Sequence, residues 1–117
     1  MTASTRFDGD DLRRADPKFR PPRFVEYLAA VAKLDRFAQD NYGKRVIDLA
    51  LRWVLDRGEA NVALWGARRP DQLASVSAAM GWHIDAAGMA EIDRILGDTV
   101  ASPVGPEFMA PPDRLAA

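Results

Sequence analysis

Apolar residues recur at steps of three and four through the first half of the chain, and this spacing gathers them on one face of a helix. From residue 23 the recurring positions are Phe24, Tyr27, Leu28, Val31, Leu34, Phe37 and Ala38. They predict a helix over residues 23–40. Gly43 follows at a point where helices commonly end in a left-handed turn, a conformation that glycine adopts without strain.

A second apolar stripe follows at similar spacing and consists of Val46, Leu49, Ala50, Trp53 and Val54. It predicts a helix over residues 45–57 that stops at Gly58. The next apolar run, residues 61–65, reads Asn-Val-Ala-Leu-Trp between two glycines. Its length is typical of a buried strand. This predicted strand has no obvious partner elsewhere in the sequence.

Two further helices are predicted by their start signals. Pro70 suits the first turn of a short helix that ends before Gly81, and Asp71 lies near the positive end of that helix. Asp85 is a typical N-cap for a helix over residues 86–96, although Gly88 lowers helix propensity by about 1 kcal/mol relative to alanine. The predicted fold is therefore mainly α with one short strand.

Polar segments flank this helical region. Residues 1–22 are rich in charge and turn formers and end in Pro21-Pro22, which opposes helix. Residues 97–117 contain four prolines and predict a wrapped or mobile tail. We therefore divide the chain into an N-terminal loop (1–22), a helical segment (23–96) that includes the strand at 61–65, and a Pro-rich tail (97–117).

Composition narrows the classes of function. The chain has 117 residues, 48% hydrophobic and 28% charged, with a formal charge of −1, so its overall field favours neither nucleic acid nor an anionic membrane. It has no cysteine and one histidine, which excludes thiolate or histidine-rich metal sites. We find no signal peptide and no apolar run long enough to span a membrane. We expect a cytoplasmic protein with no nucleic-acid or membrane partner.

The most suggestive segment for binding joins the predicted strand to the third helix. Gly66 allows close approach to the backbone, and Arg68 and Arg69 follow it directly before Pro70. A guanidinium group can make paired, charge-assisted hydrogen bonds to phosphate oxygens. The segment is therefore a candidate anion site. A polar loop whose arginines are only solvated explains the same residues, and the pattern leaves both interpretations open.

Three segments, in this order, resemble the C-terminal part of the aldo-keto reductases. The first is Phe7 to Arg14 followed by Asp16-Pro17-Lys18-Phe19, which resembles a late loop of the family. The second is Ile47 to Leu55, similar to its penultimate main helix, and the third is the glycine-arginine loop. The resemblance extends over roughly residues 6–96. It implies that the chain is a C-terminal fragment of a (β/α)8 TIM barrel, whose complete form needs about 250 residues.

The resemblance also implies a cofactor, NADP. Gly66, Ala67 and Arg68 lie where the family holds the 2′-phosphate of the adenosine, with Arg68 as the principal ligand and Arg69 as a secondary charge. Gln72 lies where a side chain reaches the adenosine portion. The family often has Glu-Asn where this chain has Ser75-Val76. Ser75 can still donate or accept a hydrogen bond, whereas the side chain of Val76 cannot.

The family's catalytic tyrosine and its supporting lysine, aspartate and histidine belong to earlier barrel segments. No motif match transfers their roles to Tyr27, Tyr42 or His83, so we expect packing or turn roles for these three residues and no catalytic residue in this chain. The function expected is that of an oxidoreductase segment that contributes the NADP 2′-phosphate loop without catalysis of its own. The alternatives are a noncatalytic helical self-assembly module and an excised piece of a full reductase.

The partners that we expect follow from the helix faces and strand edges that such a segment leaves uncovered. In a complete barrel the first two helices would lie against parallel strands, and residues 61–65 would pair with strands on both edges. We therefore expect a homo-oligomer, or association with the missing N-terminal part of the barrel.

Overall fold

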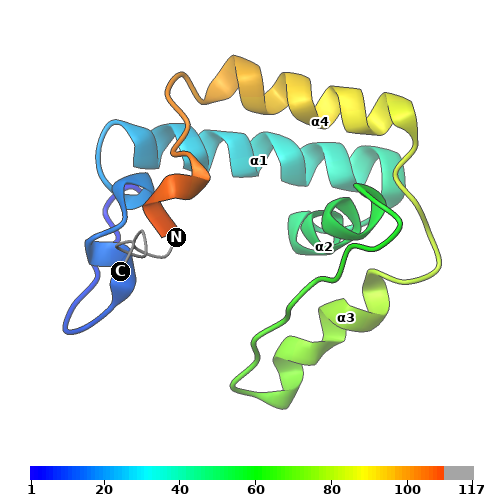
Figure 1. Cartoon of the computed structure of the whole chain (residues 1–117), viewed down its shortest axis with the longest axis horizontal. Coiled ribbons are helices and arrows are strands. Elements are labelled where there is room, and N and C mark those ends of the chain that lie inside the picture. The colour runs from blue at the N-terminus through cyan, green and yellow to red at the C-terminus, as the bar shows by residue number, and fades with distance from the viewer. Residues whose placement is uncertain (110–117) are drawn as a thin grey trace, which may run out of the picture.

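Three long helices and one short helix form the body of the molecule (Figure 1). The computed structural model describes residues 1–109, apart from the side chains of residues 74, 75 and 109. Its α-helices are α1 (Arg23–Tyr42), α2 (Val46–Asp56), α3 (Ala74–Ala78) and α4 (Ala86–Thr99). Four 3-10 helices accompany them: η1 (Leu12–Arg14), η2 (Pro17–Phe19), η3 (Pro70–Leu73) and η4 (Pro106–Met109). None of the helices in this part is long and apolar enough to cross a membrane.

The turn between α1 and α2 is fixed by local caps. Gly43 has a φ of 61°, the left-handed conformation predicted for it, and its amide donates to the Gln39 carbonyl at 3.0 Å. One carboxylate oxygen of Asp35, on α1, accepts from the amide of Val46 at 2.8 Å. Because a side chain of the first helix caps the second, the two helices meet in a defined geometry.

A hydrophobic core lies where α1, α2 and α4 meet. α4 runs back along α1 in Figure 1, and α2 packs against α1 from below. The buried centre consists of Ala38, Leu49, Ile84 and Ile92. Seven partly buried side chains pack against it: Leu34, Phe37, Tyr42, Trp53, Trp82, Met89 and Leu96.

Gly88 is needed for this packing. A Cβ atom at position 88 would collide with the Tyr42 hydroxyl and lie 2.9 Å from a methyl carbon of Ile84. Asp85 caps the same turn, since its carboxylate accepts from the Gly88 amide at 2.7 Å. The glycine therefore costs helix propensity but allows α4 to approach the end of α1 closely.

A charged junction ties α2 to the segment between α3 and α4. Arg52 and Asp56 form an ion pair of 2.7 Å in which each side chain is 10% exposed. The other oxygen of Asp56 accepts from the amide of Ile84 at 2.8 Å, and Nδ1 of His83 lies 3.0 Å from Oδ1. Arg52 also donates to the carbonyl of Ala79 at 3.4 Å, just beyond α3. The junction thus sets the position of α3 relative to α2.

The residues after α4 return to the start of α1, as Figure 1 shows. Arg23 donates to the carbonyl of Ser102 at 2.9 Å, and the amide of Val104 donates to the Tyr27 hydroxyl at 3.1 Å. The described part of the predicted tail, residues 97–109, is therefore wrapped against α1. Residues 110–117 of that tail lie outside the described part.

The predicted strand at residues 61–65 is not formed, and the described residues contain no strand. A strand requires backbone partners on its edges, and this part of the chain supplies none. Val62 and Leu64 are accordingly 76% and 93% exposed. One position of the α1 stripe also differs, because Ala30 is buried and Val31 is 47% exposed. The remaining predicted helices are present, with α1 and α4 extending to residues 42 and 99.

We predict that Asp56→Asn lowers the free energy of unfolding by about 1.5–3 kcal/mol, the range for hydrogen bonds to a charged group. Asp93→Asn is the matched control. Asp93 pairs with Arg57 at 2.9 Å but is 55% exposed, so its loss should cost less than about 1 kcal/mol. Urea denaturation at neutral pH checks both values. Equal effects of the two substitutions would contradict the proposed contribution of the junction to stability.

The contribution of Asp56 should depend on pH. Burial raises the pKa of Asp56, but the Ile84 amide, His83 and Arg52 outweigh burial and hold the pKa below its usual value. A lowered pKa in the folded state stabilises the fold above the pKa of the unfolded state and ceases to do so as the pH falls through the folded value. The stability difference between the wild type and Asp56→Asn should therefore shrink below about pH 4. A difference that grows on acidification would contradict this assignment.

Candidate functional site

The loop that leads from α2 to α3 is folded around the side chain of Gln72. Its carboxamide oxygen accepts from the backbone amide of Arg68 at 2.7 Å and from that of Arg69 at 3.1 Å. The backbone amide of Gln72 donates to the Arg69 carbonyl at 3.1 Å, and the indole N–H of Trp65 donates to the Gln72 carbonyl at 3.2 Å. These contacts give the predicted anion segment a defined shape.

The two arginines of this loop differ in their partners. Arg69 makes a two-point ion pair with Asp71, with both N–O distances at 3.0 Å, and this pairing holds the pKa of Asp71 below its usual value. Arg68 is exposed, and its guanidinium has no hydrogen-bond or ion-pair partner among the described residues. Of these two cations, Arg68 is the one available to an external anion.

Arg68 also acts at longer range on the N-terminal loop. The pKa of Asp11 is lowered to about 2, chiefly by hydrogen bonds from Arg13, and the charge of Arg68 contributes to this shift. The positive field of Arg68 therefore reaches a carboxylate far away in the sequence.

Four of the predicted site residues, Gly66, Ala67, Arg68 and Gln72, lie in this loop, and Ser75 lies on α3. Gly66 has no positive φ, and a Cβ atom at that position would meet nothing within 4 Å, so the loop's own conformation does not require glycine there. Ala67 is exposed beside Arg68. Gln72 directs its oxygen into its own loop, and the contact with adenosine expected of it stays a prediction. The side chain of Ser75 lies outside the described part.

Sequence reasoning missed two roles in this loop. It did not predict the ion pair between Asp71 and Arg69, and it did not identify Gln72 as the acceptor that shapes the turn. The signal for the first was an arginine and an aspartate two positions apart, close enough to pair within one turn. The signal for the second was a side-chain oxygen three to four positions after free backbone amides, a spacing typical of side-chain caps.

The residues considered for catalysis each make contacts within the fold. The hydroxyl of Tyr27 accepts from Val104, and His83 contacts Asp56. Tyr42 packs its ring against Phe37 and Trp82, with ring centroids at 5.7 and 5.0 Å, and burial followed by the charge of Asp85 raises its pKa. Tyr27 and Tyr42 are 15 positions apart on α1, or about 22 Å along the helix axis. Tyr27 and Tyr42 therefore do not lie in one site.

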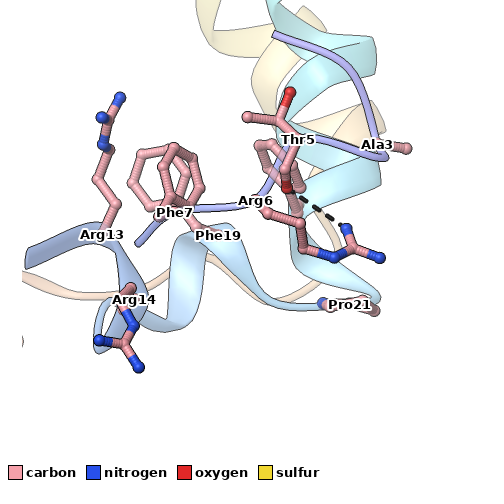
Figure 2. Close-up of a pocket in the computed structure, with 9 residues that line it drawn as sticks. Ala3, Thr5, Arg6, Phe7, Arg13, Arg14, Phe19 and Pro21 are labelled. Atoms are coloured by element: carbon pink, nitrogen blue, oxygen red, sulfur yellow. Dashed lines mark hydrogen bonds between the residues drawn. The ribbon is translucent and has the colours of Figure 1, made fainter. Parts of the chain in front are cut away.

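A cavity with a volume of about 390 Å³ lies in the N-terminal region (Figure 2). Phe7, Phe19 and Phe24 line it, together with three arginines. Figure 2 shows that Arg6, Arg13 and Arg14 point in different directions. Arg13 is paired with Asp11, and Arg14 donates to the carbonyl of Gly9. The three guanidinium groups do not converge on one anion. No group of three metal-ligating side chains occurs in the part of the chain described.

Comparison with known proteins shows the family of this chain. The model of the aldo/keto reductase family matches residues 2–97. The chain belongs to the aldo-keto reductase family. Aldo-keto reductase YhdN of Bacillus subtilis (strain 168) is 54% identical over 114 residues, which are 97% of this chain and 34% of that protein. The chain therefore spans about a third of the length of this relative.

A solved structure gives the same result for the fold. A glycerol dehydrogenase from Gluconobacter oxydans matches 94% of this chain with a TM-score of 0.81 and 44% sequence identity, again over 33% of the matched protein. The described part of this aldo-keto reductase chain is thus mainly helical and matches about a third of the solved structure. Members of the family generally use NAD(P)H.

We predict that Gln72→Ala speeds hydrogen exchange of the Arg68 and Arg69 amides by about 3- to 10-fold, because a net hydrogen bond contributes about 0.5–1.5 kcal/mol. Gln72→Glu keeps an acceptor oxygen at the same reach and is the matched control, which should preserve protection. Amide exchange followed by NMR checks both. Unchanged exchange in Gln72→Ala would show that the side chain does not shape the loop.

Proposed function

We propose that this chain is the nucleotide-binding part of an aldo-keto reductase-type oxidoreductase and that Arg68 binds the 2′-phosphate of NADP. The observation that carries the proposal is the exposed Arg68 guanidinium, which has no partner among the described residues, in a loop whose other arginine is already paired. An unpaired guanidinium can offer two parallel N–H groups to phosphate oxygens.

Gly66 supports the same proposal. The fold of this loop does not need glycine at position 66, since its φ is not positive and open space surrounds it. A glycine that the chain does not need for its own conformation is suited to the approach of a ligand to the backbone. Ala67, between Gly66 and Arg68, adds only a methyl group to this surface.

The backbone amides of the loop play a smaller part. Gln72 occupies the amides of Arg68 and Arg69, which therefore do not donate to a phosphate in this conformation. The side chain of Arg68 must supply the main contact. For Gln72 to reach the adenosine portion, its carboxamide must use its free N–H groups or leave these amides, and Ser75 is the further candidate for an adenosine contact.

In complete members of the family, bound NADPH supplies the hydride that reduces a carbonyl group. The residues of this chain would bind and orient the adenosine end of that cofactor. None of them has been assigned as a proton donor. Catalysis would therefore fall to the parts of an aldo-keto reductase that this chain does not match. We also propose a cytoplasmic location, because NADPH is available there.

We expect NADP to bind the chain and Arg68→Ala to weaken its affinity by about 1.5–3 kcal/mol, or roughly 10- to 150-fold. Isothermal titration with NADP and with NAD measures this. Arg69→Ala is the matched control and should cost less than about 1 kcal/mol, because Arg69 is already held by Asp71. Equal affinity for NAD and NADP would remove the role of the 2′-phosphate. Binding of neither would favour the noncatalytic self-assembly alternative.

We further expect that the purified chain alone does not oxidise NADPH in the presence of aldehydes or ketones. Carbonyl reduction requires a positioned proton donor and stabilisation of the developing oxyanion, and Tyr27, Tyr42 and His83 are engaged in separate structural contacts. Absorbance at the NADPH band checks this. Turnover that survives removal of contaminating reductases and is abolished by replacing one of these residues would contradict it.

A further inference from the structure

The segment directly after α4, residues 100–104, lies against the first turns of α1 (Figure 1), and we call it the strap. Three side chains of α1 bind its backbone: Arg23, Glu26 and Tyr27. The contacts are hydrogen bonds of 2.9, 3.2 and 3.1 Å to residues 102, 101 and 104 in turn. Because all three contacts are made to the backbone, they fix the course of the strap without using its side chains.

Ser102 is the only residue of the strap with a polar side chain. Its Oγ accepts from Nη2 of Arg23 at 3.1 Å, so a single guanidinium group contacts both the carbonyl and the hydroxyl of the same residue. Ser102 is exposed, whereas Arg23 is partly buried. The hydroxyl is therefore accessible from the solvent and lies beside a positive charge that the fold holds in place.

The residue after Ser102 keeps this hydroxyl outside a helix. Pro103 follows it, and the residue before a proline is disfavoured from helical backbone, so α4 cannot continue through Ser102. Ser102 is also the only serine or threonine of the chain that directly precedes a proline. A kinase must place the acceptor hydroxyl in line with the phosphoryl group that it transfers, and an exposed non-helical segment permits this.

Thr99 offers a second hydroxyl for comparison. Its Oγ1 lies 3.0 Å from Nζ of Lys33, so it also lies beside a cation. Thr99 is, however, the last residue of α4, where the helix dipole opposes a negative charge, and Asp98 precedes it. Ser102 lies beside the first residue of α1, where the same dipole favours an anion. A phosphate is therefore better stabilised on Ser102 than on Thr99.

We propose that Ser102 is a phosphorylation site and that Arg23 binds the phosphate. A serine kinase transfers the γ-phosphoryl group of ATP to Oγ of Ser102: the new O–P bond forms there, the bond to the β-phosphate oxygen breaks, ADP leaves, and a base of the kinase takes the hydroxyl proton. The product offers three acceptor oxygens to a guanidinium group that already contacts this residue. The proposal does not depend on nucleotide binding by Arg68.

Glu26 is the charged group that opposes this product. Its carboxylate accepts from the amide of Ala101, next to Ser102, and repels a phosphate there. Arg23 outweighs it because Arg23 contacts Ser102 itself, whereas Glu26 contacts the backbone of the neighbouring residue. Electrostatic interaction in an exposed region weakens with distance and is screened by salt. Phosphorylation should therefore tighten the strap on α1.

The site is tested on the complete folded chain with magnesium ATP and a proline-directed serine kinase, followed by peptide mass spectrometry. We expect phosphate on Ser102 only, and none in Ser102→Ala. Thr99→Ala is the matched control and should be phosphorylated like the wild type. Failure to modify Ser102 in the folded chain, or equal modification of Thr99, would overturn the assignment.

Phosphorus NMR of the phosphorylated chain tests the role of Arg23. The second pKa of a serine phosphate is about 6, and a nearby guanidinium group lowers it by stabilising the dianion. We expect this pKa to be lower by about 0.5–1 in the wild type than in Arg23→Gln, whereas Lys33→Gln, the matched control, should leave it unchanged.

Amide exchange reports whether the strap tightens. Hydrogen exchange of the Val104 amide should slow by about 3- to 10-fold on phosphorylation of the wild type, and it should not slow in Arg23→Gln. The same phosphate pKa in the wild type and Arg23→Gln would overturn the role of Arg23. Faster exchange of Val104 after phosphorylation would show that repulsion by Glu26 prevails and would also overturn the proposal.

Discussion

Asp56 determines where the second half of the chain lies. Its carboxylate accepts from Arg52, from the Ile84 amide and faces His83, while Arg52 reaches on to the carbonyl of Ala79. A buried carboxylate is costly unless it is paired and hydrogen-bonded, and here every contact comes from a segment that must be held in place. α2, the end of α3 and the start of α4 are therefore joined through the Arg52–Asp56 ion pair.

The segment that contains the candidate site is also held at both ends by hydrogen bonds to α2. At its start, the side chain of Asn61 donates to the carbonyl of Val54 at 2.9 Å, and at its end the contact of Arg52 with Ala79 holds the segment after α3. Between these points the loop is shaped by its own residues, with Gln72 as internal acceptor and Asp71 as partner of Arg69. Arg68 has no hydrogen-bond or ion-pair partner among the described residues.

Much of the fold could be predicted because its signals are local. Gly43 and Asp85 end and begin helices through their own backbone and side-chain geometry, so the positions of α1, α2 and α4 followed from sequence. The strand at residues 61–65 did not form because strands need partners that periodicity cannot supply. In the candidate site, the resemblance already named Arg68 as the principal ligand and Arg69 as a secondary charge, but it did not predict that Arg69 pairs with Asp71. The Asp56 junction joins residues about 28 positions apart, which no local pattern reveals.

We propose that Arg68 and its loop recognise a phosphate on the adenosine 2′ position. An NMR titration of the labelled chain with adenosine 2′-phosphate tests this, with adenosine 5′-phosphate as the comparison ligand. We expect the 2′-phosphate to shift the resonances of Gly66, Ala67 and the Arg68 guanidinium, and the 5′-phosphate to shift them much less. Shifts centred on Arg6, Phe7 and Arg13, or equal shifts with both nucleotides, would contradict it.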